Sequence, residues 1–579
     1  MKKAPITTNS KKALRKPFIQ QFFRGNLLSF TLAAIASILG AFANLILSWE
    51  IQQLVDITTG NQSKSALLQM TIFTAVLIAG CVLMDLITYL SEPRFYSCAM
   101  QQYKDYAFGE LTKKSISAFT AENTSTYISA LSNDANTIEK NYLETHFQLI
   151  RNILMFIGAF ALMLWYSPLL TLAAFLLSFL PVLASLITGN RLADIEKQVS
   201  DRNESFLATL KDSLSGFSVV KSFQAEAAIY RMVSESNKTA EDTKKHRRQV
   251  STIISCIGTV AGISAQLGVF LIGAFLALSG HDISPGILIA FVNLMNFVIQ
   301  PIATVPGILA NRKAAIALID KLAEALHSNV RSEGGTVCKE LTEGIEIKNL
   351  SYSYGTDKPV LHDINTYFEA GKSYALVGPS GSGKSTLLNL LMAGSSQYTG
   401  EILYDSVELR AISSESLYEL VSIIQQNVFV FNSSIRDNIT MFHEFDGAET
   451  DRAISLSGLD ALIRKHGEDY KCGENGNALS GGEKQRISIA RSLLRKSPVL
   501  LVDEATAALD AETAFHVTNS ILNLEGLTRI VVTHALDENL LKKYDGILTL
   551  KDGRIVESGT FEELMEKKEF FYSLYTISQ

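Results

Sequence analysis

The sequence predicts two domains of different fold classes: a membrane-spanning all-α domain of six helices, followed by an α/β domain built on a mostly parallel sheet. The first half of the 579-residue chain holds six apolar segments, each close to the roughly 20 residues that cross a bilayer as a helix. In the second half these segments cease, and short β-branched segments alternate with helical patterns. Buried helices of a large soluble protein are the alternative, but six segments arriving in pairs favour the membrane.

The six apolar segments cover residues 26–48, 66–90, 147–166, 169–187, 253–278 and 283–302. Long charged stretches with a helical pattern separate the second segment from the third and the fourth from the fifth, whereas the other joints are short. Basic residues mark the cytoplasmic side of membrane helices. The short joints on one side carry only Lys64, while one long stretch contains a basic run at residues 244–248. We therefore place the N-terminus, both long stretches and everything after the sixth segment in the cytoplasm.

Residues 1–25 carry several basic residues and no acidic one. A signal peptide begins in this way, but segment 26–48 is too long for its apolar core and no small-residue cleavage site stands out. We interpret the segment as an uncleaved first membrane helix with a basic tail. The five cysteines, scattered and without CxxC spacing, indicate neither a disulfide framework nor a zinc site.

Polar residues in the sixth apolar segment share one helix face. Asn293, Asn296 and Gln300 recur at i, i+3 and i+7. Such a face lines a transport pathway in some membrane proteins and makes ordinary interhelical hydrogen bonds in others, and both interpretations stand. Asp85 lies late in the second segment, where solvation or a local ion pair accounts for it.

A phosphate-binding pattern opens the α/β domain. Residues 372–377 predict a buried strand that leads into GPSGSGKS at 378–385 and then a helix. In the pattern GxxxxGK[ST], backbone N–H groups and the helix N-terminus surround phosphates, the lysine reaches the terminal phosphates, and the hydroxyl binds Mg²⁺. The nucleotide-binding residues predicted here are Gly378, Pro379, Ser380, Gly381, Ser382, Gly383, Lys384, Ser385 and Thr386.

Two adjacent carboxylates end a second predicted strand. Residues 498–502 (PVLLV) lead into Asp503 and Glu504. The first acid is positioned to hold Mg²⁺ in a P-loop site, and the second to orient or deprotonate the attacking water as general base. A solvated strand cap is the alternative, which the upstream P-loop disfavours.

A second anion-binding helix start lies in LSGGE at residues 479–483. Ser480, Gly481, Gly482 and Glu483 precede an amphipathic helix. Each chain thus has two phosphate-binding helix starts, but the chemistry needs only one per nucleotide. We therefore expect a head-to-tail dimer. In it, each ATP lies between the P-loop of one subunit and the Ser480 segment of the other.

Together these motifs resemble the ATP-binding cassette (ABC) transporters. Residues 378–385 resemble the Walker A motif, 479–483 the family signature, and 499–504 Walker B. The resemblance implies that ATP and Mg²⁺ are the cofactors and that Glu504 and His534 are catalytic, with His534 contacting the γ-phosphate. It also implies adenine stacking by Tyr354, Mg²⁺ contacts from Ser385, Gln426 and Asp503, and a D-loop at 507–510 that includes Asp510. Position 507 is alanine where the family commonly has serine.

The order of domains resembles bacterial half-transporters of the multidrug and lipid exporter type. We expect a cytoplasmic N-terminal tail at 1–25, a transmembrane domain at 26–318, a linker at 319–344 and an ATP-binding cassette at 345–579. In that family the long extensions end in coupling helices that contact the cassettes, and here these would lie near 117–127 and 222–229.

These observations predict a multi-pass protein of the cytoplasmic membrane that couples ATP hydrolysis to export of a small amphipathic compound, lipid or peptide. Import of a small nutrient or metal chelate by the same fold is the alternative. The expected partners are a second half-transporter subunit, identical or different, and the lipid bilayer. A soluble ABC ATPase acting on nucleic acid is disfavoured by the six apolar segments, so no nucleic-acid partner is expected.

Overall fold

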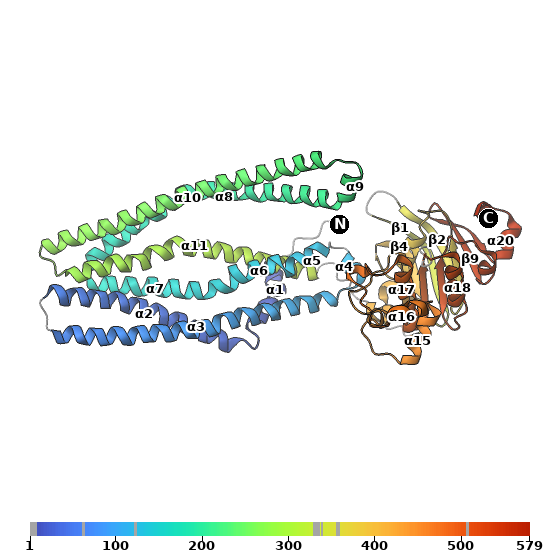
Figure 1. Cartoon of the computed structure of the whole chain (residues 1–579), viewed down its shortest axis with the longest axis horizontal. Coiled ribbons are helices and arrows are strands. Elements are labelled where there is room, and N and C mark those ends of the chain that lie inside the picture. The colour runs from blue at the N-terminus through green and yellow to red at the C-terminus, as the bar shows by residue number, and fades with distance from the viewer. Residues whose placement is uncertain are drawn as a thin grey trace. The chain divides into compact units, whose positions relative to one another are not determined.

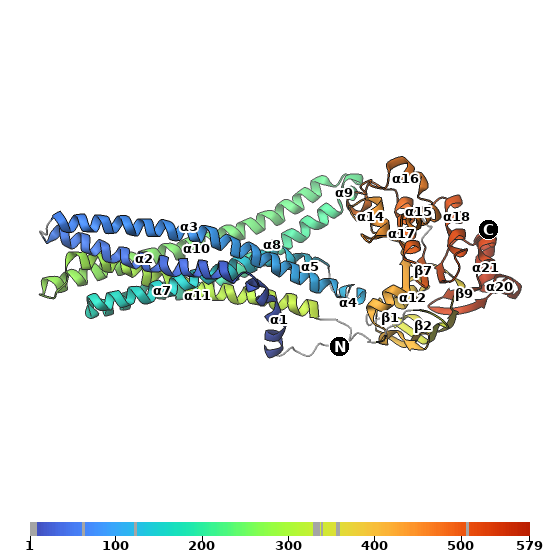
Figure 2. The same cartoon turned by 90° about the horizontal axis from the view of Figure 1, so that it is seen from below.

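The computed structural model describes residues 8–60, 64–120, 124–327, 336, 340–354, 359–395, 397–504 and 509–578, of which 8–10, 120, 181–193, 197, 511 and 578 are described by their backbone alone. The chain forms two compact units (Figures 1 and 2). One unit takes Met1–Thr112 with Thr124–His327, and the other takes Lys113–Asn123 with Ser328–Gln579.

All regular elements among the described residues of the first unit are helices. Its elements are α1 (Thr8–Phe23), α2 (Leu27–Thr59), α3 (Lys64–Thr112), α5 (Thr124–Leu131), α6 (Asn133–Ile138), the π-helical turn η1 (Glu139–Leu143), α7 (Glu144–Tyr166), α8 (Pro168–Ser215), α9 (Phe217–Ser222), α10 (Glu226–Leu278) and α11 (Pro285–His327). The six apolar segments lie in α2, α3, α7, α8, α10 and α11.

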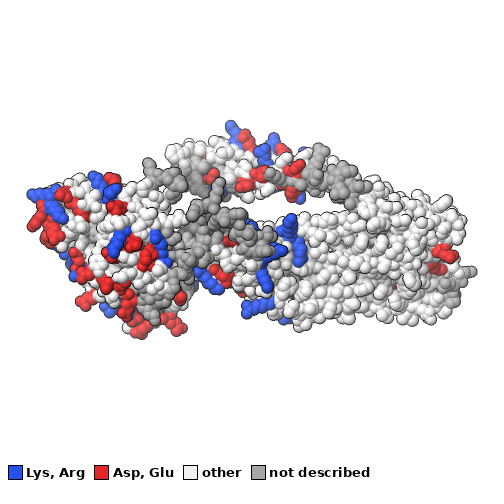
Figure 3. Space-filling view, turned by 180° about the vertical axis from the view of Figure 1, so that it is seen from behind, with Lys and Arg blue, Asp and Glu red and all other residues white. Residues whose placement is uncertain are grey.

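Five helical stretches among the described residues are long and apolar enough to cross a membrane. They contain α2, α3, α7, α10 and α11. The sixth predicted segment lies in α8, where the described apolar stretch is Pro168–Leu180 because the side chains of 181–193 are not described. A wide uncharged surface covers this part of the unit (Figure 3), and leucines such as Leu28 and Leu278 face outward. Outward-facing apolar side chains are typical of helices that lipid rather than water surrounds.

Inside this bundle the packing is close. Ala159, Val269 and Phe291, from α7, α10 and α11, are buried in one apolar cluster. In α10, a Cβ on Gly273 would lie 2.3 Å from a methyl carbon of Leu288. Membrane helices associate through such close packing, because lipid tails are as apolar as the side chains and the hydrophobic effect does not drive the helices together. α8 and α10 run alongside each other as a pair (Figures 1 and 2).

The segment predicted as a tail is mostly helical, since residues 8–23 form α1. Its Phe22 is buried and stacks on Tyr103 of α3 with ring centroids 5.3 Å apart. Two of its basic residues pair with α11: Lys11 lies 2.7 Å from Glu324, and Arg15 lies 3.4 Å from Asp320. The sequence prediction missed this helix because its phenylalanines are interleaved with basic residues.

A polar cluster joins three helices at the end of α2. Asp56 accepts hydrogen bonds from the Ser284 hydroxyl (2.9 Å) and the backbone N–H of Gly286 (3.0 Å). Gln52 donates to Asp56 (2.7 Å) and accepts from the Tyr166 hydroxyl (3.3 Å). Asp56 therefore caps the N-terminus of α11, where a carboxylate is stabilised by unpaired N–H groups and the helix dipole. The sequence shows that Gln52 and Asp56 lie at i and i+4 on one helix, but it does not reveal their partners on the other two helices.

The polar face of the sixth apolar segment makes interhelical hydrogen bonds. Asn293 donates to Ser48 of α2 (3.3 Å), and Asn296 accepts from Gln266 of α10 (2.6 Å). These contacts support the packing interpretation for both asparagines. Asn296 and Gln300 are also exposed on α11, so the pathway interpretation stands for this face. Asp85 is exposed on α3.

The second unit contains two sheets. A four-stranded antiparallel sheet has the order β2-β1-β4-β5, and a six-stranded sheet has the order β10-β9-β3-β8-β7-β6. In the latter, all strands from β9 to β6 are parallel, and β10 pairs antiparallel to β9. The strands are β1 (Gly344–Ser353), β2 (Pro359–Glu369), β3 (Ser373–Val377), β4 (Tyr398–Tyr404), β5 (Val407–Glu408), β6 (Val421–Ile424), β7 (Val499–Asp503), β8 (Thr528–Val532), β9 (Gly546–Lys551) and β10 (Arg554–Gly559).

Helices complete this unit. They are α4 (Ile116–Thr120), α12 (Lys384–Leu391), η2 (Leu409–Ala411), α13 (Ser414–Leu420), α14 (Ile435–Thr440), α15 (Gly447–Leu456), α16 (Asp460–His466), η3 (Glu474–Gly476), α17 (Gly481–Arg495), α18 (Ala511–Leu522), α19 (Glu538–Leu541), α20 (Phe561–Lys567) and α21 (Phe570–Ser578). The parallel sheet with helices confirms the predicted α/β class.

A short helix from the first long extension belongs to this second unit. α4 overlaps the first predicted coupling region, and the backbone N–H of Ile116 donates to the Tyr418 hydroxyl at 2.9 Å. The predicted linker at 319–344 begins within α11, which continues to His327, and much of the rest lies outside the described residues. The predicted domain boundaries stay predictions.

The junction of α2 and α11 should not tolerate a side chain at Gly286. A Cβ there would lie 2.4 Å from the backbone oxygen of Gln52 and 2.6 Å from an Asp56 oxygen. We expect Gly286→Ala to cost about 1–3 kcal/mol through overpacking and to lower the apparent midpoint of thermal unfolding by a few degrees. Gly262→Ala is the control, because nothing lies within 4 Å of its Cβ position. Equal midpoints for the two variants would contradict this prediction.

Candidate nucleotide-binding site

The P-loop lies between β3 and α12, as the sequence predicts. β3 ends at Val377 and α12 begins at Lys384. Gly383 has φ 101°, a left-handed conformation that glycine adopts without strain. A Cβ on Gly378 would lie 2.1 Å from the Leu550 carbonyl oxygen. The glycines are therefore required by the path of the loop against β9.

Lys384 and Ser382 show that the loop is built for an anion. Lys384 is buried, and its Nζ donates to the carbonyl oxygens of Gly378 (2.8 Å) and Pro379 (2.9 Å). Burial lowers its pKa, against the charges of Glu504 and Asp503, which raise it. The Oγ of Ser382 is also buried, with no hydrogen-bond partner among the described residues. A phosphate would satisfy both groups.

Asp503 completes a pair of oxygen ligands. It is the last residue of β7, and its Oδ1 accepts a hydrogen bond from the Ser385 hydroxyl at 2.9 Å. Burial raises the pKa of this carboxyl, while Ser385 and the charge of Lys384 act in the opposite direction. A hydroxyl and a carboxylate at this distance fit Mg²⁺, which prefers oxygen ligands and is usually held by one or two protein groups together with phosphate.

Glu504 lies between Gln426 and His534. Its Oε2 accepts from Gln426 Nε2 at 2.8 Å, and its Oε1 lies 2.7 Å from His534 Nε2. The three residues come from neighbouring parallel strands: Gln426 follows β6, Glu504 follows β7, and His534 follows β8. Because the carboxyl ends of parallel strands meet at one edge of the sheet, residues far apart in the sequence converge here. The backbone of Glu504 has φ 48°, an uncommon conformation that occurs often at functional sites.

Tyr354 offers an exposed ring next to the P-loop helix. It follows β1, its side chain is 60% exposed, and its hydroxyl lies 3.4 Å from Thr386 Oγ1. The Tyr352 ring packs edge-on against it, with centroids 5.0 Å apart. An exposed aromatic face that its neighbour holds in place can stack on a planar base.

The signature segment forms a separate helix N-terminus. Ser480 caps α17 in a reciprocal pair with Glu483: the Ser480 Oγ accepts from the Glu483 N–H, and the Glu483 carboxylate accepts from the Ser480 N–H at 2.7 Å. Burial would raise the pKa of Glu483, but the Ser480 hydrogen bonds and the charges of Arg486 and Lys465 hold it below its ordinary value. Among the described residues, no hydrogen bond or ion pair joins Ser480–Glu483 to the P-loop.

The structure thus brings most of the predicted site residues together. Gly378–Thr386, Gln426, Asp503, Glu504 and His534 surround one edge of the sheet, whereas the Ser480 segment stands apart within the chain. Asp510 caps α18 by accepting from the Thr513 N–H at 2.9 Å. Ala507 and Ala508 lie outside the described residues. The sequence did not reveal the contacts that Glu504 makes with Gln426 and His534, since motif spacing carries no distances between side chains.

Fold and site together define a membrane protein with a P-loop ATPase domain. The family described as "ABC transporter transmembrane region" matches residues 30–302, and the family described as "ABC transporter" matches residues 361–507. The chain belongs to the ABC transporter family. It is a multi-pass membrane protein that binds ATP and couples ATP hydrolysis to transport.

Curated relatives extend this match along the chain. The ATP-dependent lipid A-core flippase of Pseudomonas aeruginosa is 33% identical over 443 residues, covering 74% of this chain and 71% of that protein. The protein of the same name from Escherichia coli O6:K15:H31 is 28% identical over 554 residues, covering 94% of both. Among solved structures, a bacterial Atm1-family ABC exporter with ATP bound has a TM-score of 0.84 at 22% identity over 96% of this chain and 98% of that one, which shows the shared fold.

Alanine substitutions at Gly383 and Gly381 distinguish the effect of a steric clash from the effect of backbone strain in the P-loop. Both have positive φ, but only at Gly383 would a Cβ meet other atoms, at 2.6 Å from Leu361 and 3.2 Å from the Val360 oxygen. Either alanine costs about 1 kcal/mol of backbone strain. We expect Gly383→Ala to weaken ATP binding roughly tenfold more than Gly381→Ala does. Equilibrium binding of a fluorescent ATP analogue measures this, and equal losses would show that the clash is relieved.

Proposed function

We propose that this chain is one subunit of a dimeric exporter that moves a lipid, or a small amphipathic compound or peptide, out of the cytoplasmic leaflet at the expense of ATP. The observation that carries the proposal is the Glu504 bridge to Gln426 and His534 beside the Ser385–Asp503 pair. It provides the groups that ATP hydrolysis needs, in a chain whose relatives are named lipid A-core flippases. Import by the same fold has no observation in its favour.

Each site residue has a proposed role in hydrolysis. Lys384 and the P-loop N–H groups bind the phosphates, and Tyr354 stacks on adenine. Ser385, Asp503 and Gln426 hold Mg²⁺, which when bound would offset the negative charge of the phosphates.

The proposed base is Glu504, and His534 orients the reacting groups from the other side. Glu504 is held by both Gln426 and His534. To act on water, it must exchange one of these hydrogen bonds for one to the water. Because Gln426 connects the base with the β6 end of the sheet, this rearrangement can transmit the state of the nucleotide.

A second subunit completes the site. The Ser480 helix start makes no hydrogen bond or ion pair with the P-loop of its own chain among the described residues, and hydrolysis needs such donors on the far side of the phosphates. In the first unit, α9 has no buried residue, and its Phe217 and Val219 are exposed. We propose that α9, next to the predicted coupling region at 222–229, docks on the cassette of the partner. The partner is an identical or a different half-transporter.

The proposed orientation follows from charge. The N-terminus, both long helical extensions and the ATPase unit lie in the cytoplasm, because basic residues such as Lys244, Lys245 and Arg248 accompany the extensions. The polar residues that we propose line the pathway on α11, Asn296 and Gln300, are exposed and uncharged. A pathway lined in this way suits cargo whose apolar part stays in contact with the bilayer.

Reconstitution in liposomes tests the proposed function. ATP added outside reaches only those molecules whose ATPase unit faces outward, so an exporter should move a fluorescent phospholipid from the outer to the inner leaflet. We expect ATP to protect the label from a membrane-impermeant quencher. Glu504→Gln, which keeps the size of the side chain but removes its basicity, should reduce both ATPase rate and protection at least 100-fold.

The outcomes of the liposome assay are distinguishable. ATP-dependent loss of protection would show movement in the direction of import. Active ATPase with no lipid movement would contradict the lipid cargo, and full turnover by the Glu504→Gln variant would overturn the assignment of the base.

Complementation between two inactive variants tests the dimer. Lys384→Met removes the phosphate-binding lysine, and Ser480→Arg blocks the signature helix start. In a mixed head-to-tail dimer, one site combines the intact P-loop of one chain with the intact signature of the other. We expect co-expression to restore ATPase activity to about a quarter of the wild-type rate if both chains pair at random. Mixtures no more active than either variant alone would contradict the shared site.

A further inference from the structure

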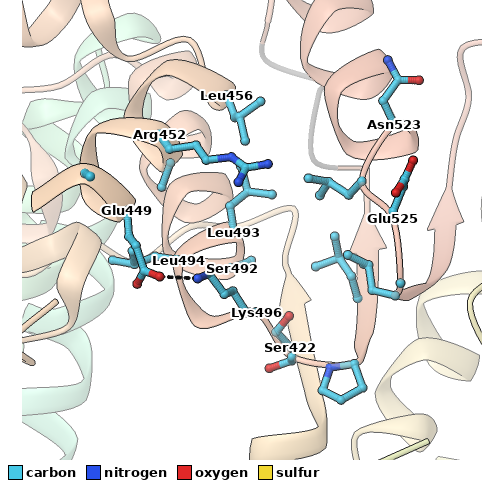
Figure 4. A pocket seen from close by; sticks show the side chains of 18 residues that line it. Ser422, Glu449, Arg452, Leu456, Ser492, Leu493, Leu494, Lys496, Asn523 and Glu525 are labelled. Atoms are coloured by element: carbon cyan, nitrogen blue, oxygen red, sulfur yellow. Dashed lines mark hydrogen bonds and ion pairs between the residues drawn. The ribbon is translucent and has the colours of Figure 1, made fainter. Parts of the chain in front are cut away.

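A cavity of about 850 Å³ in the ATPase unit lies at the opposite edge of the sheet from the nucleotide site. Its walls are one face of α15, the last turn of α17 with the residues that follow it, and the 523–527 loop between α18 and β8 (Figure 4). Ser422 and Leu500, near the amino ends of β6 and β7, also line it. Gln426 and Glu504 follow the carboxyl ends of the same two strands, so the two sites share strands but no residues.

Two buried hydroxyl groups at the cavity lack partners. Ser422 and Ser497 are 6% and 5% exposed, and the Oγ of each has no hydrogen-bond partner among the described residues. Buried hydroxyls are ordinarily satisfied, because leaving one unpaired costs the free energy of its lost hydration. Neither oxygen is itself exposed to the cavity, but rotation of each serine side chain about χ1 would let a ligand with acceptor oxygens supply the missing partner.

The charges around the cavity favour an anion on the α15 side. The Arg452 side chain extends from α15 into the open space (Figure 4), and no ion pair of its guanidinium is present among the described residues. Lys496 is paired with Glu449. The remaining charge is Glu525 on the opposite wall, which would repel an anion. Leu456, Leu493 and Leu527 give the lining an apolar part.

We propose that this cavity binds a small organic anion, a carboxylate or phosphate ester with a short apolar part, and that its occupancy changes the rate of ATP hydrolysis. Arg452 pairs with the anionic group, the Ser422 and Ser497 hydroxyls donate to its oxygens, and the leucines contact the apolar part. Arginine is suited to this because its planar fork of N–H donors matches carboxylate and phosphate oxygens.

The effect on hydrolysis follows from the elements that the cavity joins. α17 begins beside Ser480 and its last turn lines the cavity through Leu494, while β7 lines the cavity through Leu500 and ends at Asp503. A ligand that holds α15 and α17 against the sheet therefore acts on the far ends of the elements that carry the signature segment and the Mg²⁺ ligand. Coupling of this kind needs two sites that bias one arrangement of the same elements.

Hydrogen exchange measured by mass spectrometry on the full chain in lipid nanodiscs tests binding. The probe is octyl phosphate, and octanol is the uncharged control. We expect octyl phosphate, but not octanol, to slow amide exchange in peptides covering 447–456 and 523–527. This readout separates the cavity from any binding to the membrane unit.

Removing a positive charge and removing a negative charge from the cavity should change its affinity for octyl phosphate in opposite directions. Arg452→Gln should weaken binding about tenfold by removing a charged hydrogen bond, and Glu525→Gln should strengthen it a few-fold by removing repulsion. Arg554→Gln, an exposed arginine on β10, is the matched control and should change nothing. Protection that survives Arg452→Gln, or that weakens with Glu525→Gln, would overturn the anion assignment.

The ATPase rate of the same samples tests the effect on hydrolysis. We expect saturating octyl phosphate to change the wild-type rate by at least about twofold and to leave the Arg452→Gln rate unchanged. If octyl phosphate binds but the ATPase rate does not change, the regulatory role is overturned and the binding site stands. Because octyl phosphate is itself a small amphipathic compound, a rate change that persists in Arg452→Gln belongs to transport through the membrane unit, and only the difference between wild type and this variant belongs to the cavity. A failure of the regulatory role is therefore distinguishable from a failure of the proposed exporter.

Discussion

Parallel pairing of β6, β7 and β8 is the constraint on which the nucleotide site depends. The register fixes Ile424 opposite Val502 and Asp503 opposite Val532, so the residues that follow each strand start from neighbouring points. Glu504 can then contact Gln426 and His534 at once, although about a hundred residues of chain separate the outer two. The strands are buried and apolar, so this geometry is supported by the core of the unit.

The membrane unit is stabilised by different interactions, because the lipid that surrounds it is apolar. Its stability depends on close approach of backbones and on a few hydrogen bonds between helices. The Asp56 cap on α11 and the Asn293–Ser48 contact are of this kind. Both lie where a polar group without a partner would be costly. The polar contacts named here therefore differ between the units: in one they form the site proposed for ATP hydrolysis, and in the other they join helices.

The sequence predicts much of this structure because its motifs are local. GPSGSGKS requires a strand before it and a helix after it, and both are present around Gly378 and Lys384. Long apolar segments similarly predict the membrane helices. What the sequence could not supply were contacts between distant elements: the Glu504 bridge, the burial of α1 through Phe22, and the Asp56 cap. These depend on side-chain distances across the fold, which no periodicity or spacing encodes. The hydroxyls of Ser422 and Ser497 are a further case, since nothing in their local sequence marks them as buried.

The ion pairs between α1 and α11 have a consequence for biosynthesis. Arg15 and Asp320 are separated by 305 residues, and a ribosome adding roughly 5–20 residues per second needs about 15–60 seconds to make that length. Through this interval Lys11 and Arg15 of α1 lack their partners on α11. α11 thus supplies the ion-pair partners of α1 last. Assembly of the membrane unit is completed only as translation enters the ATPase unit.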